Sequence, residues 1–333
     1  MEITVIGGGS WGTAIARLLK INGHEVSFYV RDPKTKKAIN DTGCNDKYLP
    51  GISLEGLKAT TNIDVAIDGS RLVVMAVPSQ NVRSVFETQQ HLLDGKIIVN
   101  LSKGLELGTL DRISQIAEEL LPKSTFVALS GPSHAEEVGR NIPTAVVAAS
   151  KDIDVAKMIQ NVFSNDSFRV YTNTDLVGVE IGGALKNIIA LAAGMSEGLG
   201  FGDNTTAALA TRGIYEMSKL GLALGAEAQT FNGLSGIGDL IVTCTSTHSR
   251  NRRAGILIGK GLSKDQASLE VGQVVEGIKT TKSAYELSKK HKISMPITQK
   301  LYEVLYQALD PRKAVVDLMR RDYKDEIEPL FKH

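Results

Sequence analysis

The sequence predicts an α/β domain built on a doubly wound parallel sheet, followed by an all-α domain. Two observations predict the sheet: short apolar runs alternate with helix-like segments, and the first run ends in a glycine-rich turn. The runs are nearly continuous in hydrophobicity, as strands covered by helices on both faces should be. A third observation predicts the helical half, because strand-like runs largely stop after about residue 175.

The expected strands are rich in Val and Ile, and each is followed by a polar or helix-like segment. They cover residues 2–7, 25–30, 71–77, 96–101, 125–131 and 144–150. We place the domain boundary near residue 172, at the end of "FRVYTN", which gives a sheet domain over 1–172 and a helical domain over 173–333. The charged stretch 320–329 is predicted to be a solvated, partly frayed tail.

Composition excludes several classes of function. Lys and Arg number 38 and Asp and Glu number 37, so the excess of positive charge that nucleic-acid partners usually demand is lacking. The two cysteines lie far apart, which fits a reducing cytoplasm. We see no secretory signal in the opening strand. No integral membrane segment is expected, because only ten uncharged residues separate Lys186 from Glu197 and a span needs about 20.

The turn after the first strand reads "GGGSWG" and places Gly7, Gly9 and Gly12 at G-x-G-x-x-G spacing. Gly7 permits a tight turn, Gly9 lets a pyrophosphate approach the backbone, and Gly12 lets the following helix pack closely on the strand. The helix N-terminus supplies N–H groups and a partial positive charge. At the first strand-to-helix turn of a βαβ unit this motif predicts a Rossmann dinucleotide site, with Ser10 and Trp11 as further contacts.

The second strand ends in Arg31 and Asp32. An acidic residue at this strand end commonly binds the ribose hydroxyls of NAD, whereas a nearby arginine suits the 2′-phosphate of NADP. Arg31 therefore favours NADP, and Asp32 keeps NAD open. A surface arginine in a salt bridge is the alternative interpretation.

Lys186 lies in the middle of an apolar helix, "VEIGGALKNIIALAAGMSEG" over 179–198. Its neighbours three or four residues away, and one turn further, are Gly182, Gly183, Ile189, Ala190 and Ala193. Four of these five are Gly or Ala, so we expect space for a ligand beside the ammonium group. Partial desolvation and nearby cations would lower the lysine pKa toward neutrality, which a proton-transfer group needs. Spacing alone leaves this hypothesis level with a lysine that reaches solvent from a tightly packed helix.

Polar residues in four loops add candidates for a site. Lys103 follows a strand, at the carboxyl end where open α/β sheets bind ligands, although a surface charge is the alternative. Asp239 lies in a glycine-rich loop, where an aspartate is often only a turn-former. Ser249 is expected to cap a helix whose first turn holds Arg250, so backbone N–H groups and a guanidinium would converge on a phosphate. Ser133 is expected to cap a shorter helix.

Nine short motifs occur in an order that resembles the bacterial glycerol-3-phosphate dehydrogenases that use NAD or NADP. They are "GGGSWGTAIA", "YLPG" at 48–51, "VPSQ" at 77–80, "SKGLE" at 102–106, "SGPSHAEEV" at 130–138, "GALKN" at 183–187, "GLSGIGDLIVTC" at 233–244, "SRN" at 249–251 and "VEG" at 275–277. The resemblance covers nearly the whole chain. Its one small departure is the isoleucine of "GIGDL", where the family suggests leucine.

The resemblance implies reversible reduction of dihydroxyacetone phosphate to sn-glycerol 3-phosphate by hydride from NADPH or NADH, supplying glycerophospholipid synthesis. It implies that Lys186 is the acid/base residue. The substrate-binding residues that it implies are Lys103, Gly131, Ser133, Lys186, Asp239, Ser249, Arg250 and Asn251. The cofactor-binding residues that it implies, beyond the loop residues and Arg31, are Tyr48, Lys103, Ala135, Arg250, Val274 and Glu276. No metal is required.

Two rival functions stay open on the sequence alone. A dehydrogenase of β-hydroxyacids or ketopantoate-like acids would share the loop and the lysine, but it would have no need of residues 249–251 as a phosphate grip. A dinucleotide sensor without turnover would have no use for a desolvated lysine. Exposed helical faces in the second half are compatible with a homodimer.

Overall fold

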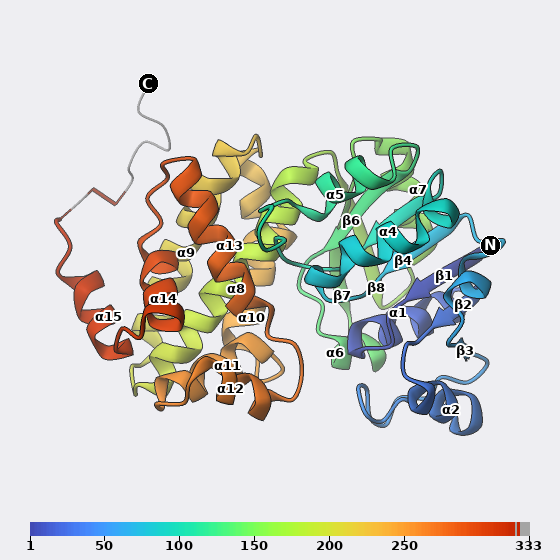
Figure 1. Ribbon diagram of the computed structural model, residues 1–333, viewed down its shortest axis with the longest axis horizontal. Helices are drawn as coiled ribbons and strands as arrows, with labels where there is room; N and C mark the ends of the chain where they lie inside the picture. The colour runs from blue at the N-terminus through green and yellow to red at the C-terminus, as the bar shows by residue number, and fades with distance from the viewer. Residues whose placement is uncertain (324, 327–333) are drawn as a thin grey trace.

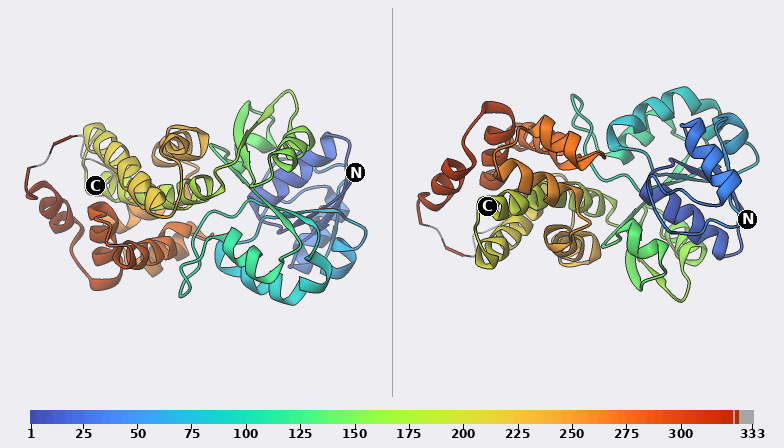
Figure 2. Two further views of the ribbon diagram at one scale, coloured as in Figure 1. Left: turned by 90° about the horizontal axis from the view of Figure 1, so that it is seen from above. Right: turned by 90° about the horizontal axis from the view of Figure 1, so that it is seen from below.

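The computed structural model describes residues 1–323, 325 and 326, and it has two lobes (Figure 1). One lobe contains the N-terminus and a twisted sheet with helices on both sides. The other lobe contains only helices, and the two views of Figure 2 show the same division. The predicted tail at 320–329 lies partly outside the described residues.

An eight-stranded sheet forms the centre of the first lobe, in the order β3-β2-β1-β4-β5-β6-β7-β8. The strands are β1 (Glu2–Ile6), β2 (Glu25–Tyr29), β3 (Lys58–Thr60), β4 (Leu72–Met75), β5 (Ile97–Asn100), β6 (Thr125–Ser130), β7 (Thr144–Ala149) and β8 (Phe168–Asn173). The order reverses between β1 and β4, which is where doubly wound sheets bind ligands. The fold class predicted from the sequence is confirmed, and each of the six expected runs forms a strand.

The structure differs from the prediction at three places in the sheet. β8, formed by the run used to mark the domain boundary, was not among the six expected strands. β3 was not expected, because its three residues carry no apolar run and it forms by pairing with β2 at the sheet edge. β7 runs antiparallel to β6, whereas all other neighbouring strands are parallel. The connection between β6 and β7 contains only the five-residue helix α6 (Ala135–Gly139). A parallel crossover normally needs a full helix on one face of the sheet, so the chain instead turns back.

Helices cover both faces of the sheet, because successive residues of each strand point to opposite sides. Val5 and Val74 belong to one buried cluster, while Ile6 and Met75 belong to the cluster on the other face. The helices of this lobe are α1 (Ser10–Ile21), α2 (Pro33–Thr42), α3 (Ile63–Ile67), η1 (Ser79–Asn81), α4 (Val82–Leu93), α5 (Ile113–Leu120), α6 and α7 (Ile153–Phe163).

The second lobe packs around the long helix α8, whose apolar residues form a core of their own. Its elements are α8 (Leu176–Gly198), α9 (Asp203–Ala223), η2 (Ala228–Asn232), the π-turn η3 (Leu234–Gly238), α10 (Asp239–Thr245), α11 (Arg250–Gly259), α12 (Lys264–Val271), α13 (Glu276–Lys290), α14 (Pro296–Gln307) and α15 (Pro311–Met319). The proposed boundary after residue 172 falls at the end of β8, and the exact division into domains stays a prediction.

By length and composition α8 is the one helix in the described part of the chain that could cross a membrane. However, 83% of its 18-residue apolar window is buried inside the protein. A buried core helix passes the same test, so α8 is weak evidence for a membrane span.

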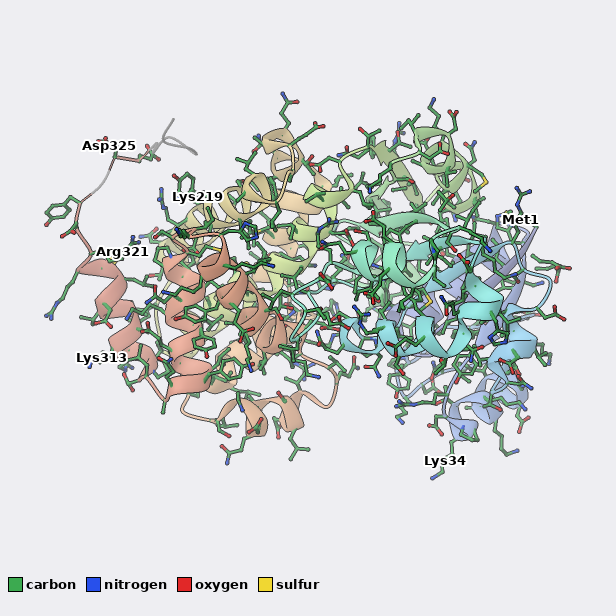
Figure 3. The ribbon with its side chains drawn as sticks, turned by 45° about the horizontal axis from the view of Figure 1, so that its top comes forward. Met1, Lys34, Lys219, Lys313, Arg321 and Asp325 are labelled. Carbon is green, nitrogen blue, oxygen red and sulfur yellow. The ribbon has the colours of Figure 1, made fainter. Side chains whose placement is uncertain are left out.

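Charged side chains are spread over both lobes. Lys34 lies on the sheet lobe, and Lys219 and Lys313 lie on the helical lobe (Figure 3). The chain as a whole carries almost equal numbers of basic and acidic residues, with a formal net charge of +1.

Candidate active site

The turn between β1 and α1 requires glycine at two of the predicted positions. Gly7 has φ +126°, and a Cβ atom there would lie 2.4 Å from the carbonyl oxygen of Ala76. A Cβ atom at Gly12 would lie 1.9 Å from the carbonyl oxygen of Gly7. These close approaches fold the turn tightly between the sheet and α1.

The space beside Gly9 is open, because a Cβ atom there would meet nothing within 4 Å. Gly9 is the N-cap of α1 and provides no side-chain cap, so the first N–H groups of the helix are left for another acceptor. An open cradle at an uncapped helix N-terminus fits the pyrophosphate of a dinucleotide. Ser10 and Trp11 begin α1 beside the cradle, and the Ser10 hydroxyl donates to the carbonyl oxygen of Tyr48 at 2.6 Å.

Asn45 supports this turn, and sequence reasoning missed it. Its side chain is buried, and Nδ2 donates to the carbonyl oxygen of Gly8 at 3.1 Å and to Oγ1 of Thr13 at 2.8 Å. The segment that carries Asn45 and Tyr48 is thereby fastened to the dinucleotide turn. An asparagine three residues before "YLPG" gives no recognisable signal in the sequence, since its partners lie more than 30 residues away.

The structure assigns Asp32 to a helix cap. Its carboxylate accepts from the backbone N–H of Lys34 at 3.0 Å and from Oγ1 of Thr35 at 3.1 Å, and it lies 3.5 Å from Nζ of Lys47. The N–H of Lys34, together with Thr35 and Lys47, outweighs the effect of desolvation and holds the pKa of Asp32 below its ordinary value. Arg31 beside it is exposed.

Three charged side chains from distant parts of the chain meet where the two lobes join. Asp239, at the start of α10, accepts from Nζ of Lys186 on α8 and from Nζ of Lys103 at 2.6 Å. Lys186 also donates to Oγ1 of Thr243 at 2.9 Å, and Lys103 donates to the carbonyl oxygen of Gly131 at 3.0 Å. Asp239 is 1% exposed and Lys186 is 7% exposed, so Lys186 does not reach solvent in the way that the alternative interpretation required.

Burial and the neighbouring charges together set the pKa values of this cluster. Burial lowers the pKa of Lys186 to about 7, with the Asp239 carboxylate opposing the shift and the Lys103 ammonium adding to it. Burial alone would raise the pKa of Asp239, but the two ammonium groups outweigh it and hold that pKa below its ordinary value. A lysine that titrates near neutral pH is suited to proton transfer.

The expected ligand space on the Lys186 face of α8 is filled by the protein itself at two positions. A Cβ atom at Gly182 would lie 2.6 Å from the carbonyl oxygen of Ser235 in η3. A Cβ atom at Gly183 would lie 2.8 Å from Oγ of Ser130. The two glycines therefore allow η3 and the end of β6 to approach α8, and this part of the prediction is wrong.

Ser133 does not cap α6 as predicted. The N-cap is His134, which makes no side-chain cap, and the Ser133 hydroxyl instead donates to the carbonyl oxygen of Gly131 at 2.8 Å. The same oxygen accepts from Lys103, so Ser133 lies beside the lysine cluster. Ala135 begins α6 and is buried.

The start of α11 matches the prediction, because Ser249 is its N-cap and accepts from the N–H of Arg252 at 3.2 Å. Arg250 is exposed in the first turn. Asn251 is buried, and Nδ2 donates to Oδ1 of Asn187 at 2.8 Å while its Oδ1 accepts from the N–H of Gly277 at 2.8 Å. One Nδ2 hydrogen of Asn251 remains for a ligand.

A hydrogen bond connects Asn187 to this cluster, and the remaining candidates lie at or just before the start of α13. Asn187, next to Lys186 in sequence, reaches the carbonyl oxygen of Lys103 at 3.4 Å. Glu276 begins α13 immediately before Gly277, and exposed Val274 lies two residues earlier. Asn187 and Thr243 were missed by sequence reasoning, although the four-residue spacing of Asp239 and Thr243 on one helix would have indicated a shared face.

Many of the predicted residues therefore form two groups. Lys103, Gly131, Ser133, Lys186 and Asp239 are linked by hydrogen bonds where the lobes join, and Asn187 connects Lys103 to Asn251. The Glu276 carboxylate is not bonded to this group and instead accepts from Ser79 across the same junction. Ser10 and Tyr48 contact each other at the dinucleotide turn. Within the described residues, no group of three or more His, Cys, Asp or Glu side chains is placed to hold a metal ion.

A Rossmann sheet with this turn, joined to a helical lobe at a buried lysine, is the arrangement of an NAD(P)-dependent dehydrogenase. Comparison with known families identifies which one. The N-terminal region of NAD-dependent glycerol-3-phosphate dehydrogenase matches residues 2–156, and its C-terminal region matches residues 175–316. The chain belongs to this family.

Individual relatives agree with this assignment. The chain is 53% identical to the glycerol-3-phosphate dehydrogenase [NAD(P)+] of Thermoanaerobacter sp. (strain X514), over 99% of this chain and 100% of that protein. It is 52% identical to the protein of the same name from Clostridium tetani, over 97% of this chain and 93% of that protein. The crystal structure of glycerol-3-phosphate dehydrogenase from Coxiella burnetii superposes with a TM-score of 0.93 at 38% identity, covering 96% of this chain and 99% of that chain.

Proposed function

We propose that this chain catalyses the reversible reduction of dihydroxyacetone phosphate to sn-glycerol 3-phosphate with NADPH or NADH, and so supplies glycerophospholipid synthesis. The observation that carries this proposal is the buried cluster of Lys186, Asp239 and Lys103 in a chain of this family. A keto group that accepts hydride needs a proton on its oxygen, and this cluster holds a proton on a lysine that titrates near neutral pH.

The residues divide the work as follows in this proposal. The reduced nicotinamide supplies the hydride. Lys186 donates a proton from Nζ to the carbonyl oxygen, and solvent returns a proton to the lysine after each turnover. Asp239 orients both ammonium groups, and Lys103 adds positive charge beside the developing alkoxide.

The substrate phosphate is assigned to the start of α11. Ser249 and the first N–H groups of that helix provide donors, and Arg250 provides a guanidinium in the same turn. Asn251 ties this helix to Asn187 on α8, so the phosphate site and Lys186 are held at a fixed separation. A keto acid without a phosphate would leave the donors of α11 unused, which argues against that rival.

Arg31→Ala is expected to raise the KM for NADPH about tenfold and to change the KM for NADH by less than about twofold, because only NADPH has a 2′-phosphate for the guanidinium. Asp32 is occupied as the cap of α2, which favours NADPH over NADH in the wild type. Initial rates with both cofactors for Arg31→Ala and wild type are the measurement. Equal effects on the two cofactors would contradict the assignment.

The reaction itself is tested by mixing the protein with NADPH and dihydroxyacetone phosphate and following the absorbance of the reduced nicotinamide. Oxidation is expected with this substrate, and 2-keto and 3-keto acids should give none. Oxidation with the keto acids alone would indicate a keto-acid dehydrogenase. Binding of NADPH without turnover of any substrate would indicate a dinucleotide sensor. A cytoplasmic location and a homodimer are further parts of this proposal, and a sedimentation experiment tests the second.

A further inference from the structure

The motif "VPSQ" at 77–80 has no role in the mechanism above, yet its serine makes contacts across the junction of the lobes. Ser79, in η1 after β4, is 1% exposed. Its backbone N–H donates to Oε1 of Glu276 at 3.0 Å, and its hydroxyl donates to Oε2 of the same carboxylate at 2.7 Å. One residue of the sheet lobe thus holds both oxygens of a glutamate in the helical lobe.

This paired contact fixes the plane of the Glu276 carboxylate. A glutamate side chain normally has considerable rotamer freedom, and ordering it when a ligand binds costs free energy. The carboxylate offers about four lone-pair positions, and the two bonds from Ser79 occupy one on each oxygen. The remaining positions can accept from a ligand without a change of rotamer.

Contacts around Ser79 hold it in place. Gly104 leaves room for the hydroxyl, since a Cβ atom there would lie 2.5 Å from Oγ of Ser79. The neighbouring Gln80 donates to the carbonyl oxygen of Leu105 at 2.8 Å and accepts from the N–H of Leu107 at 3.0 Å. The turn that carries Ser79 is therefore fastened to the loop that carries Lys103.

We propose that Ser79 is a positioning residue that orients the Glu276 carboxylate to accept the carboxamide N–H of the nicotinamide. The proposal rests on the proposed function, and on the family resemblance for the placement of Glu276 among the cofactor-binding residues. Ser79 itself does not contact the reacting atoms. It acts by keeping an acceptor from the helical lobe ordered against the sheet lobe before the cofactor arrives.

Equilibrium binding tests the proposal without turnover. The single tryptophan, Trp11, lies in the dinucleotide turn, so its fluorescence reports binding. We expect Ser79→Ala to raise the Kd for NADP⁺ about tenfold, as loss of a charge-assisted hydrogen bond should. The Kd for the 3-acetylpyridine analogue, which lacks the carboxamide N–H, should change less than about twofold. The Kd for 2′-phospho-ADP-ribose, which lacks the nicotinamide, should not change.

A double-mutant cycle separates positioning from a merely structural role. In the Glu276→Ala background, Ser79→Ala should have no further effect on the Kd for NADP⁺. Ser84→Ala, on the adjacent helix α4, is the matched control and should bind all three probes as the wild type does. Equal weakening of all three probes by Ser79→Ala, additive effects in the cycle, or an unchanged Kd for NADP⁺ would each overturn the proposal. Failure of the proposed reaction would appear separately, as wild type that binds NADP⁺ but does not turn over dihydroxyacetone phosphate.

Discussion

Lys186→Ala is expected to lower kcat for reduction of dihydroxyacetone phosphate by about 10²–10⁴-fold, the usual contribution of a positioned general acid. The Kd for NADPH should change by less than about twofold, because Lys186 contacts Asp239 and Thr243 rather than the dinucleotide turn. Asp239 keeps Lys103 as a partner in the variant, so no buried charge is left alone. Steady-state kinetics and fluorescence titration measure the two quantities.

Lys313→Ala is the control for this prediction, because Lys313 is exposed on α15 and far from the junction of the lobes (Figure 3). It should retain the wild-type rate. A Lys186→Ala enzyme within about threefold of the wild-type rate would remove Lys186 from the mechanism, since a general acid contributes at least about 10²-fold.

Asp239→Asn is expected to have the second largest effect, on both stability and rate. Two ammonium groups meet this buried carboxylate, and breaking a buried ion pair by removing one partner costs about 3–5 kcal/mol. The Asp239 carboxylate raises the pKa of Lys186, against burial and the Lys103 charge, so its loss should lower that pKa further. The lysine would then be neutral at pH 7, and we expect kcat to fall by about 10²-fold or more.

Urea unfolding and initial rates measure these effects. Asp154→Asn, at an exposed carboxylate on α7, is the matched control; it should leave the rate unchanged and lower the stability by less than about 1 kcal/mol. An Asp239→Asn protein with wild-type stability would show that the two lysines do not depend on this carboxylate. An unchanged rate would show that the cluster does not set the protonation of Lys186.

Much of the sheet could be predicted from the sequence, because parallel strands that are buried on both faces are continuous apolar runs. β3 carries no such run, and its formation depends on pairing with β2. The direction of β7 depends on a short connection whose path no local pattern encodes. Local signals succeeded at the glycine turn and at the Ser249 cap. They failed at Ser133, whose hydroxyl donates to the carbonyl oxygen of Gly131 and does not cap α6.

The candidate site could be predicted only as a set of residues. Lys186 and Asp239 are 53 positions apart, and nothing in their spacing indicates an ion pair. The glycines near Lys186 correctly indicated that side chains are missing from that face of α8. Whether a ligand or η3 fills the space depends on the tertiary packing, which the local sequence does not show. Asp32 shows the same limit, since one position serves equally well as a ribose ligand or as a helix cap.

The pH dependence of kcat/KM for dihydroxyacetone phosphate tests the central claim most directly, because it reports the pKa of the acid in the enzyme before substrate binds. Burial and the neighbouring charges place the pKa of Lys186 at about 7, and the protonated form is the one that reduction requires. Between pH 7 and 9.5, where the substrate phosphate stays dianionic, kcat/KM should fall by up to about tenfold per pH unit. Oxidation of sn-glycerol 3-phosphate, which needs the neutral lysine, should instead rise to a plateau over the same range. Profiles that are flat in both directions, or that stay unchanged in Lys186→Ala, would contradict proton transfer by this lysine.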